Sequence, residues 1–447
     1  MSFLVWIWGA LLLALLWLLI SRGYSGGILL LAYFIGLSII HVPGALIYLG
    51  SAPGLFEEPE THLGFKATLI GMAALLAGAL AALRTQFGRA PPPNGPSFAF
   101  SNLGYVMVAL GAVMYFIVMP VVSFISSITA LLSAVGSLLP FGFWCFFYGA
   151  MESHDNRKMV LGIALLPLLP LSTMITGGFI GYGVYWVIAV LALVYVKSSQ
   201  KRIWVLLAPL IVLLGLSFAV AYFGGRNELR EAVWNERADL GARIERVVAM
   251  VSSFELLNLD NPDHVKSLND RLNQNVLVGT AIYRHEAGDS ELALGGTVPW
   301  WALIPRVIWP DKPAVGGGGS VVSEFTGMTF GEDTSVGAGQ PLEFYINFGW
   351  AGIVGGFLLL GYVLARLDMA LDLAFRQGDL NRLLNTGLPG LALLQPGGNL
   401  LEILVAVVGA MVAARAVAAG LERFHILQSM SPSRDLLNDP APGRVRR

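Results

Sequence analysis

The sequence has few charged residues for its length. Of its 447 residues only 13% are charged, about half of the roughly 25% that soluble globular chains carry, while 55% are hydrophobic and the mean hydropathy is +0.68. A single core cannot bury so much apolar surface, so a soluble enzyme, a disordered chain and a collagen-like chain are excluded. Basic residues are nowhere concentrated as contact with a nucleic-acid backbone requires. What remains is a polytopic helical membrane protein without a nucleic-acid partner.

Residues that hold metals or act as nucleophiles are also scarce. The one cysteine, Cys145, lies within an apolar run, so the sequence offers neither a disulfide within the chain nor a cysteine-based metal site. No spacing of His, Asp or Glu is typical of a metal site, and neither a Ser-His-Asp pattern nor a Walker loop is present. We therefore expect no metal and no cofactor.

Long apolar runs are what the chain has instead. A helix that crosses a bilayer needs about 20 mostly apolar residues. The first run has no basic segment before it and no small-residue cleavage site after it, so we interpret it as a retained helix and not as a signal peptide. The sequence predicts an all-α polytopic membrane protein with about 11 transmembrane helices. They are expected at 3–20, 27–49, 67–83, 103–121, 129–150, 159–176, 183–197, 203–223, 343–365, 384–396 and 400–418.

The few charges collect in one segment. Residues 224–343 hold 10 of the 28 Lys and Arg residues and 17 of the 29 Asp and Glu residues. This concentration predicts one large extracytoplasmic helical loop between the eighth and the ninth transmembrane helix. The expected organisation is an N-terminal transmembrane bundle (1–223), the extracytoplasmic loop (224–342), C-terminal transmembrane helices (343–424) and a disordered cytoplasmic tail (425–447).

The distribution of Lys and Arg also predicts the orientation. Basic residues occupy one set of the short connections and the C-terminal tail, whereas the other set contains only Lys66. The positive-inside rule then places the tail in the cytoplasm. An odd number of spans puts the N-terminus on the outer face, together with the large loop. We expect a multi-pass protein of the bacterial inner (cytoplasmic) membrane with a periplasmic loop.

The loop itself has recognisable patterns. Residues 227–256 and 264–283 have apolar residues at helical spacing, with charged residues on the other faces. Trp300, Trp301 and Trp309 flank an apolar stretch, and such aromatic residues lie at the boundary between membrane and water. This part of the loop is therefore expected to lie along the outer leaflet.

Three motifs in and after the loop carry a family resemblance. Residues Ile304–Pro313 (IPRVIWPDKP) resemble the P-R-x-x-W-P-x-K-P signature of Wzy-type oligosaccharide repeat-unit polymerases. Residues Glu343–Gly349 (EFYINFG) look like the G-E-x-Y-x-N-F-G element of that family, and Asp270–Asn273 (DRLN) is similar to its D/R-R-x-N helix. The resemblance covers roughly residues 224–365.

The sequence departs from the family pattern in two places, one of them being that the Gly usually preceding the family's Glu is Leu342 here. The family often has Gly-Ser-Arg-Gly at the outer end of a middle helix, and the comparable stretch here, Thr176–Gly181 (TGGFIG), contains no arginine. The sequence Gly224-Gly225-Arg226 is a candidate to replace it, at a different position in the chain.

The resemblance implies a membrane glycosyltransferase. Such enzymes polymerise undecaprenyl-pyrophosphate-linked oligosaccharide repeat units into a surface polysaccharide or exopolysaccharide, of which O-antigen is an example. They transfer the growing chain from a lipid-pyrophosphate donor to the next lipid-linked unit at the outer face. The resemblance also implies a chain-length regulator and a flippase as partners, besides the lipid bilayer.

Four basic residues are candidates for binding the donor pyrophosphate. Arg306 lies between tryptophans, and a guanidinium binds phosphate through two parallel hydrogen bonds, although an arginine there also suits lipid headgroups. Arg271 would provide a second phosphate or sugar contact, or else pair with Asp270. Arg226 and Lys312 would neutralise phosphate, with a boundary charge and a turn residue as the alternatives.

Two acids are candidates for orienting or deprotonating the acceptor hydroxyl. Glu343 lies where an apolar helix begins, and an acid at membrane depth is costly without a function. The alternative is that Glu343 caps this helix and interacts favourably with its dipole. Asp311 lies between two prolines and is alternatively a turn residue. Tyr345 and Asn347, from the same motif as Glu343, are candidate substrate contacts.

Other functions stay open at this point. An O-antigen ligase uses the same donor on a different acceptor, but the loop has no ligase-type histidine motif. A polysaccharide or lipid transporter should carry ionisable residues in mid-span, whereas the spans here are nearly free of charge. A non-catalytic subunit of a polysaccharide assembly complex is the third alternative.

Overall fold

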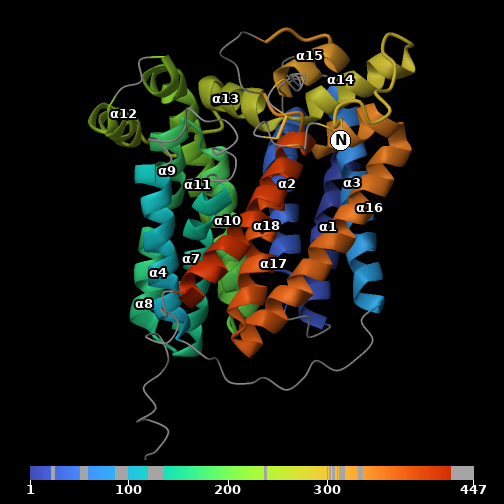
Figure 1. Cartoon of the computed structure of the whole chain (residues 1–447). Helices are drawn as coiled ribbons and strands as arrows, with labels where there is room; N and C mark the ends of the chain where they lie inside the picture. Colours follow the sequence, from blue (N-terminus) through green and yellow to red (C-terminus); the bar gives the residue numbers. More distant parts are fainter. Residues whose placement is uncertain are drawn as a thin grey trace, which may run out of the picture.

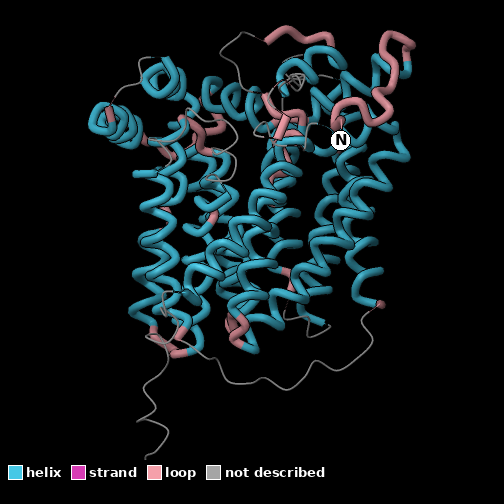
Figure 2. Tube along the Cα trace, viewed as in Figure 1, coloured by secondary structure: helices cyan, strands magenta, loops and turns pink. Residues whose placement is uncertain are grey.

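A computed structural model gives the structure of the chain. It describes residues 1–21, 26–50, 59–85, 99–118, 134–235, 239–299, 301, 304, 308–309, 311, 318–330 and 336–423. Over these residues the chain forms helices and no strand (Figure 2). The all-α class predicted from the apolar runs is therefore confirmed.

The N-terminal half supplies most of the bundle. Its helices are α1 (Ser2–Ser21), α2 (Ile28–Gly50), α3 (Pro59–Arg84), α4 (Phe100–Val113) with the π-helical turn η1 (Met114–Val118), α7 (Leu138–Glu152), α8 (Asn156–Leu165), α9 (Leu168–Gly177), α10 (Gly181–Lys197) and α11 (Lys201–Arg230) with η2 (Glu231–Asn235). The C-terminal half adds α16 (Gly339–Gln377), α17 (Leu380–Leu393) and α18 (Leu400–Arg423).

The described residues contain nine helical segments that are long and apolar enough to cross a membrane, with α8 and α9 counted together. Every span expected from the sequence coincides with a helix. Two of the expected spans are shorter than these nine segments, namely α10, with 17 residues, and α17, with 14 residues. At 1.5 Å per residue α17 is about 21 Å long, less than the roughly 30 Å of a hydrocarbon core. The protein is thus a multi-pass membrane protein in which α17 is too short to span alone.

The polar segment folds into a layer of short helices at one end of the bundle. These helices are α12 (Leu240–Ser252), α13 (Pro262–Leu272), α14 (Asn275–Glu286) and α15 (Gly318–Thr326). Figure 1 shows them together at the top, at the same end as the N-terminus. We call this end the loop side.

The helices of this layer are shorter than the sequence indicated. The expected helix at 227–256 is divided, because α11 runs on from the membrane to Arg230 and α12 begins only at Leu240. The expected helix at 264–283 is divided at residues 273–274 into α13 and α14. Hydrophobic periodicity continues across both interruptions, so it did not reveal them.

Helices α3 and α16 form the tightest contact of the bundle. A Cβ added to Gly78 of α3 would lie 2.0 Å from the carbonyl oxygen of Leu358, and one added to Gly361 of α16 would lie 1.9 Å from that of Leu75. Small residues at such crossings let two membrane helices approach backbone to backbone. Glycine is therefore required at both positions.

Helix α16 is broken near its start. Phe348 has φ −142° and ψ 20°, and Gly349 has φ +60° and ψ −149°, a conformation open almost only to glycine. The motif at 343–349 was expected to open a transmembrane helix. Instead it lies mostly in a short first segment, 339–347, and the long transmembrane part follows the break.

Candidate functional site

Three arginines gather where α11 leaves the membrane on the loop side. Arg226 and Arg230 are one turn apart on α11 and are only 7% and 9% exposed. Arg271 comes from α13 and remains exposed to solvent. The positive charges of Arg230 and Arg271 act on Arg226. The structure thus brings together two predicted phosphate-binding residues and adds a third, Arg230.

This cluster contains more positive charge than its surroundings balance. Among the described residues, the buried Nε of Arg226 and Nη1 of Arg230 have no hydrogen-bond partner. Partial burial and then the charge of Arg230 lower the pKa of Arg271, while the neighbouring Asp270 opposes this shift. A buried cation without a counter-charge is costly, and a bound anion would remove that cost. The arrangement is therefore suited to binding an anion with several oxygen atoms.

Arg230 is held by the stretch that lacked an arginine in the sequence. Its Nε donates to the carbonyl oxygen of Gly178 at 3.5 Å, and its guanidinium lies 4.8 Å and 5.0 Å from the ring centres of Phe179 and Trp234. Contacts of this geometry are cation–π interactions. The hydroxyl of Tyr222 donates to the same carbonyl oxygen at 2.8 Å. Arg230 is thus positioned against Gly178 and Phe179 by a hydrogen bond and by ring contacts.

The sequence contained a signal for Arg230 that was missed. Tyr222, Arg226, Arg230 and Trp234 are spaced by four residues, which places them along one face of a helix. The predicted end of the span at residue 223 concealed this pattern, because it left Arg226 at the boundary and assigned Arg230 to a separate loop helix. Recognising α11 as one continuous helix through Arg230 would have revealed it.

The position of Arg271 depends on a polar network just beyond it. Asn273, after α13, donates from Nδ2 to Thr61 Oγ1 at 3.1 Å. Asn275 donates from Nδ2 to the carbonyl oxygen of His41 at 2.7 Å, and its Oδ1 lies 2.7 Å from Nδ1 of the same histidine. These contacts fix the α13–α14 corner onto α2 and α3. They therefore also fix the helix end that carries Arg271.

The motif at 343–349 lies in a different part of the loop side, at the start of α16, and Glu343, Tyr345 and Asn347 are buried there. Glu343 is 2% exposed and accepts a hydrogen bond from the backbone N–H of Leu400, the first residue of α18. The sequence left open whether Glu343 caps its own helix. The structure shows that it caps the N-terminus of another helix, where a carboxylate also interacts favourably with the helix dipole.

Asn347 and Tyr345 make contacts within the protein as well. Asn347 accepts from the N–H of Gly295 at 2.9 Å and donates to Thr297 Oγ1 at 2.7 Å. Tyr345 is 1% exposed, and its ring packs against the ring of Trp350. No hydrogen bond or ion pair within the described chain joins these residues or Glu343 to the three arginines. The structure therefore does not bring the two groups of predicted site residues together.

The central motif of the predicted site is only partly described. Arg306 and Lys312 lie outside the described residues, and Asp311 is exposed. The predictions for these three residues stay predictions. Within the described residues, no group of three or more His, Cys, Asp and Glu side chains is arranged to hold a metal ion.

Comparison with known proteins identifies no relative of this chain. No family model matches the chain, and neither a curated protein nor a solved structure shows a significant match.

Proposed function

We propose that this protein is a polysaccharide polymerase of the bacterial inner membrane. It joins oligosaccharide repeat units that are carried on undecaprenyl pyrophosphate, at the outer face of the membrane, with the loop side in the periplasm. The observation that carries the proposal is the cluster of Arg226, Arg230 and Arg271, which has buried N–H groups without partners where a span meets the loop layer. The resemblance of three sequence motifs to Wzy-type polymerases supports the same reaction.

In this proposal the arginines bind the pyrophosphate of the donor. The hydroxyl oxygen of the acceptor sugar attacks the anomeric carbon of the donor glycan, and the bond from that carbon to the phosphate oxygen breaks. The lipid pyrophosphate leaves with the electron pair of that bond, and the hydroxyl proton passes to a carboxylate. Guanidinium groups stabilise the charge that grows on the leaving phosphate. Arg306 and Lys312 are proposed to contribute from the adjoining motif.

The surroundings of the two predicted acids favour different roles for them. The carboxylate of Glu343 is engaged with the backbone of α18, which supports a positioning role for it. Asp311 is exposed between the two predicted phosphate-binding residues of its motif. We therefore assign to Asp311 the role of accepting the proton of the acceptor hydroxyl. Tyr345 and Asn347 then hold the loop layer in place and do not contact the substrate directly.

The proposal is tested by the length of the glycan on its lipid carrier. A strain without this gene is complemented with wild type, Arg230→Ala, Arg230→Lys or the control Arg246→Ala, whose guanidinium is exposed and 3.5 Å from Glu228. A hydrogen bond to a charged group contributes about 1.5–3 kcal/mol, so loss of Arg230 should slow transfer by about 10- to 150-fold.

We expect Arg230→Ala to accumulate single repeat units and the Arg246→Ala control to produce the full ladder. Arg230→Lys keeps the charge but loses the planar fork and the stacking, so it should give short chains. A normal ladder in Arg230→Ala at wild-type protein levels would exclude the proposal. A full-length ladder that fails to reach its final acceptor when the gene is absent would indicate a ligase or an exporter.

A further inference from the structure

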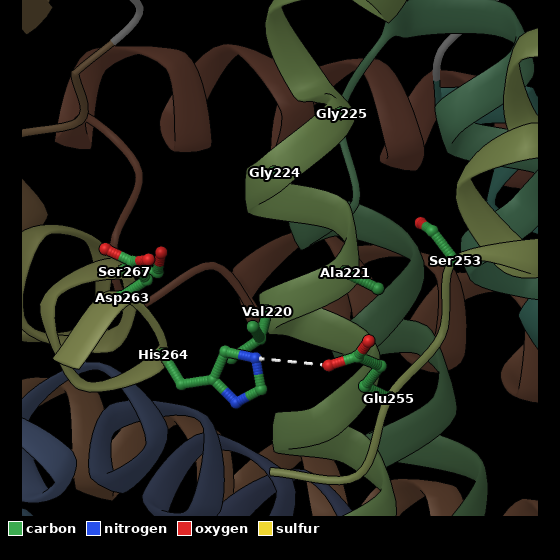
Figure 3. A pocket seen from close by; sticks show the side chains of 9 residues that line it. All are labelled: Val220, Ala221, Gly224, Gly225, Ser253, Glu255, Asp263, His264 and Ser267. Carbon is green, nitrogen blue, oxygen red and sulfur yellow. Dashed lines mark ion pairs between the residues drawn. The ribbon is translucent and has the colours of Figure 1, made fainter. Parts of the chain in front are cut away.

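A pocket lies on the loop side, between the two helices that carry the arginines. It has a volume of about 250 Å³, which suits a single sugar ring better than a long oligosaccharide. Figure 3 shows that one wall is α11 and that the opposite wall is α13, with the segment after α12 closing a third side. The lining residues are Val220, Ala221, Gly224, Gly225, Ser253, Glu255, Asp263, His264 and Ser267.

The pocket is built from segments that are fixed in place. The backbone N–H of Leu257 donates to Ser217 Oγ of α11 at 2.9 Å, which attaches the segment after α12 to this helix. The side chain of Asn261 accepts from the N–H of Asp263 at 3.0 Å and so caps the first turn of α13. Both carboxylates of the pocket therefore come from backbone that is anchored on either side of it.

The hydrogen bond to His264 determines its tautomer. Its Nδ1 accepts from the backbone N–H of Asn258 at 3.2 Å, so the neutral ring carries its proton on Nε2. This Nε2 faces Oε2 of Glu255 at 4.0 Å, the separation drawn in Figure 3. That distance is too long for a hydrogen bond. A donor and an acceptor thus face each other across a gap that one hydroxyl group can bridge.

The side chains of the pocket favour a sugar over an anion or a metal ion. Two carboxylates, Glu255 and Asp263, repel an anion. The proton on Nε2 of His264 prevents this nitrogen from acting as a metal ligand. A sugar hydroxyl both donates and accepts, so it satisfies His264 and Glu255 together, and Ser253 and Ser267 offer further hydroxyl partners. The apolar side chains on the α11 wall suit the C–H face of a sugar ring.

The pocket is continuous with the arginine cluster along both helices. Gly225 is followed directly by Arg226 on α11. Ser267 precedes Arg271 by four residues on α13, about 6 Å along the helix axis. A glycan whose pyrophosphate lies at the arginines would therefore have a sugar residue within reach of this pocket.

We infer that the pocket between α11 and α13 is a glycan subsite, in which Glu255, His264 and Ser267 bind the hydroxyl groups of a sugar of the lipid-linked substrate. This inference rests on the proposed function, because it names the part of the substrate that lies beside the pyrophosphate. It also assigns a role to Gly224, since a side chain at this position would extend into the space that the sugar occupies.

Two glycines of α11 provide a matched test. An added Cβ meets no atom within 4 Å at either Gly224 or Gly215, so neither position is closed to a side chain at its Cβ. Gly224 borders the pocket, whereas Gly215 lies nine residues earlier on α11 and is not among the residues that line it. Gly224→Leu should fill the pocket and Gly215→Leu should not. Glu255→Gln, a conservative change of an exposed side chain, removes the acceptor charge without filling the space.

The purified proteins in lipid nanodiscs are titrated with methyl glycosides of glucose, galactose, mannose, rhamnose and N-acetylglucosamine, and binding is followed by saturation-transfer NMR. Inorganic pyrophosphate is titrated separately as the probe of the arginine cluster. We expect wild type and Gly215→Leu to bind at least one glycoside. Gly224→Leu and Glu255→Gln should bind it about tenfold or more weakly, with their affinity for pyrophosphate retained.

The two probes separate the subsite from the proposed function. If no glycoside binds the wild type, or if Gly224→Leu binds it equally well, the glycan subsite is excluded even where pyrophosphate still binds. If glycosides behave as expected and pyrophosphate does not bind, the subsite stands and the arginine cluster loses its assigned role.

Discussion

Replacing Arg226 with methionine should stabilise the empty protein while weakening its binding of anions. Methionine retains most of the length of the arginine stem but removes a buried charge whose Nε has no partner among the described residues. A buried donor without a partner costs about 1–3 kcal/mol. The charges of Arg230 and Arg271 add repulsion. The free energy of unfolding of ligand-free Arg226→Met should therefore rise by about 1–3 kcal/mol.

The effect of the same change on pyrophosphate binding has the opposite sign. Loss of a charge-assisted hydrogen bond of about 2 kcal/mol weakens the affinity about 30-fold. At a pyrophosphate concentration of about 100 times the wild-type Kd, the ligand stabilises the wild type by about 2.7 kcal/mol. For Arg226→Met the same concentration is only about three times Kd, so the stabilisation falls to about 0.9 kcal/mol.

Thermal unfolding in nanodiscs, with and without inorganic pyrophosphate, measures both effects. Arg246→Met serves as the control, because Arg246 is exposed and its surface ion pair contributes little to stability. High salt should reduce the pyrophosphate effect in the wild type, since Arg271 is open to solvent and screened. A less stable ligand-free Arg226→Met with an unchanged response to pyrophosphate would refute the idea that the cluster is an uncompensated anion site.

Three further substitutions test the contacts that hold the helices around the site in place. Gly361→Ala should lower the unfolding midpoint strongly, because its Cβ would lie 1.9 Å from a carbonyl oxygen of α3, whereas Gly355→Ala, with no atom within 4 Å, should not. Asn275→Ala removes three buried side-chain hydrogen bonds and should cost about 2–4 kcal/mol, measured by denaturant titration; an unchanged midpoint would contradict the anchoring role. Glu343→Gln keeps an oxygen that can accept from Leu400 and should preserve the glycan ladder, whereas Glu343→Leu should shorten it. Loss of the ladder in Glu343→Gln would instead identify this residue as the catalytic base.

The transmembrane helices could be located from the sequence because hydropathy is a local property. A run of apolar residues partitions into lipid whatever its neighbours are, and all the expected spans coincide with helices. The concentration of charge in residues 224–343 likewise predicted a large helical loop between the spans, although with longer helices than the structure has. Arg226 and Arg271 could be named as candidates because one follows directly on a predicted span and the other lies in a recognised motif.

Contacts between helices could not be predicted from hydropathy, because they depend on which helix faces pack against each other. Hydropathy did not show that Arg230 of α11 reaches Gly178 at the end of α9, or that Glu343 caps α18 and not its own helix. The break at Gly349 was equally concealed, since the residues on both sides favour a helix. The pocket around His264 arises only where α11 and α13 come together.

In this protein the sequence alone determined which segments enter the membrane, because partitioning is decided segment by segment. The tertiary structure decided which polar groups meet, because hydrogen bonds and charges act only between atoms that packing brings close.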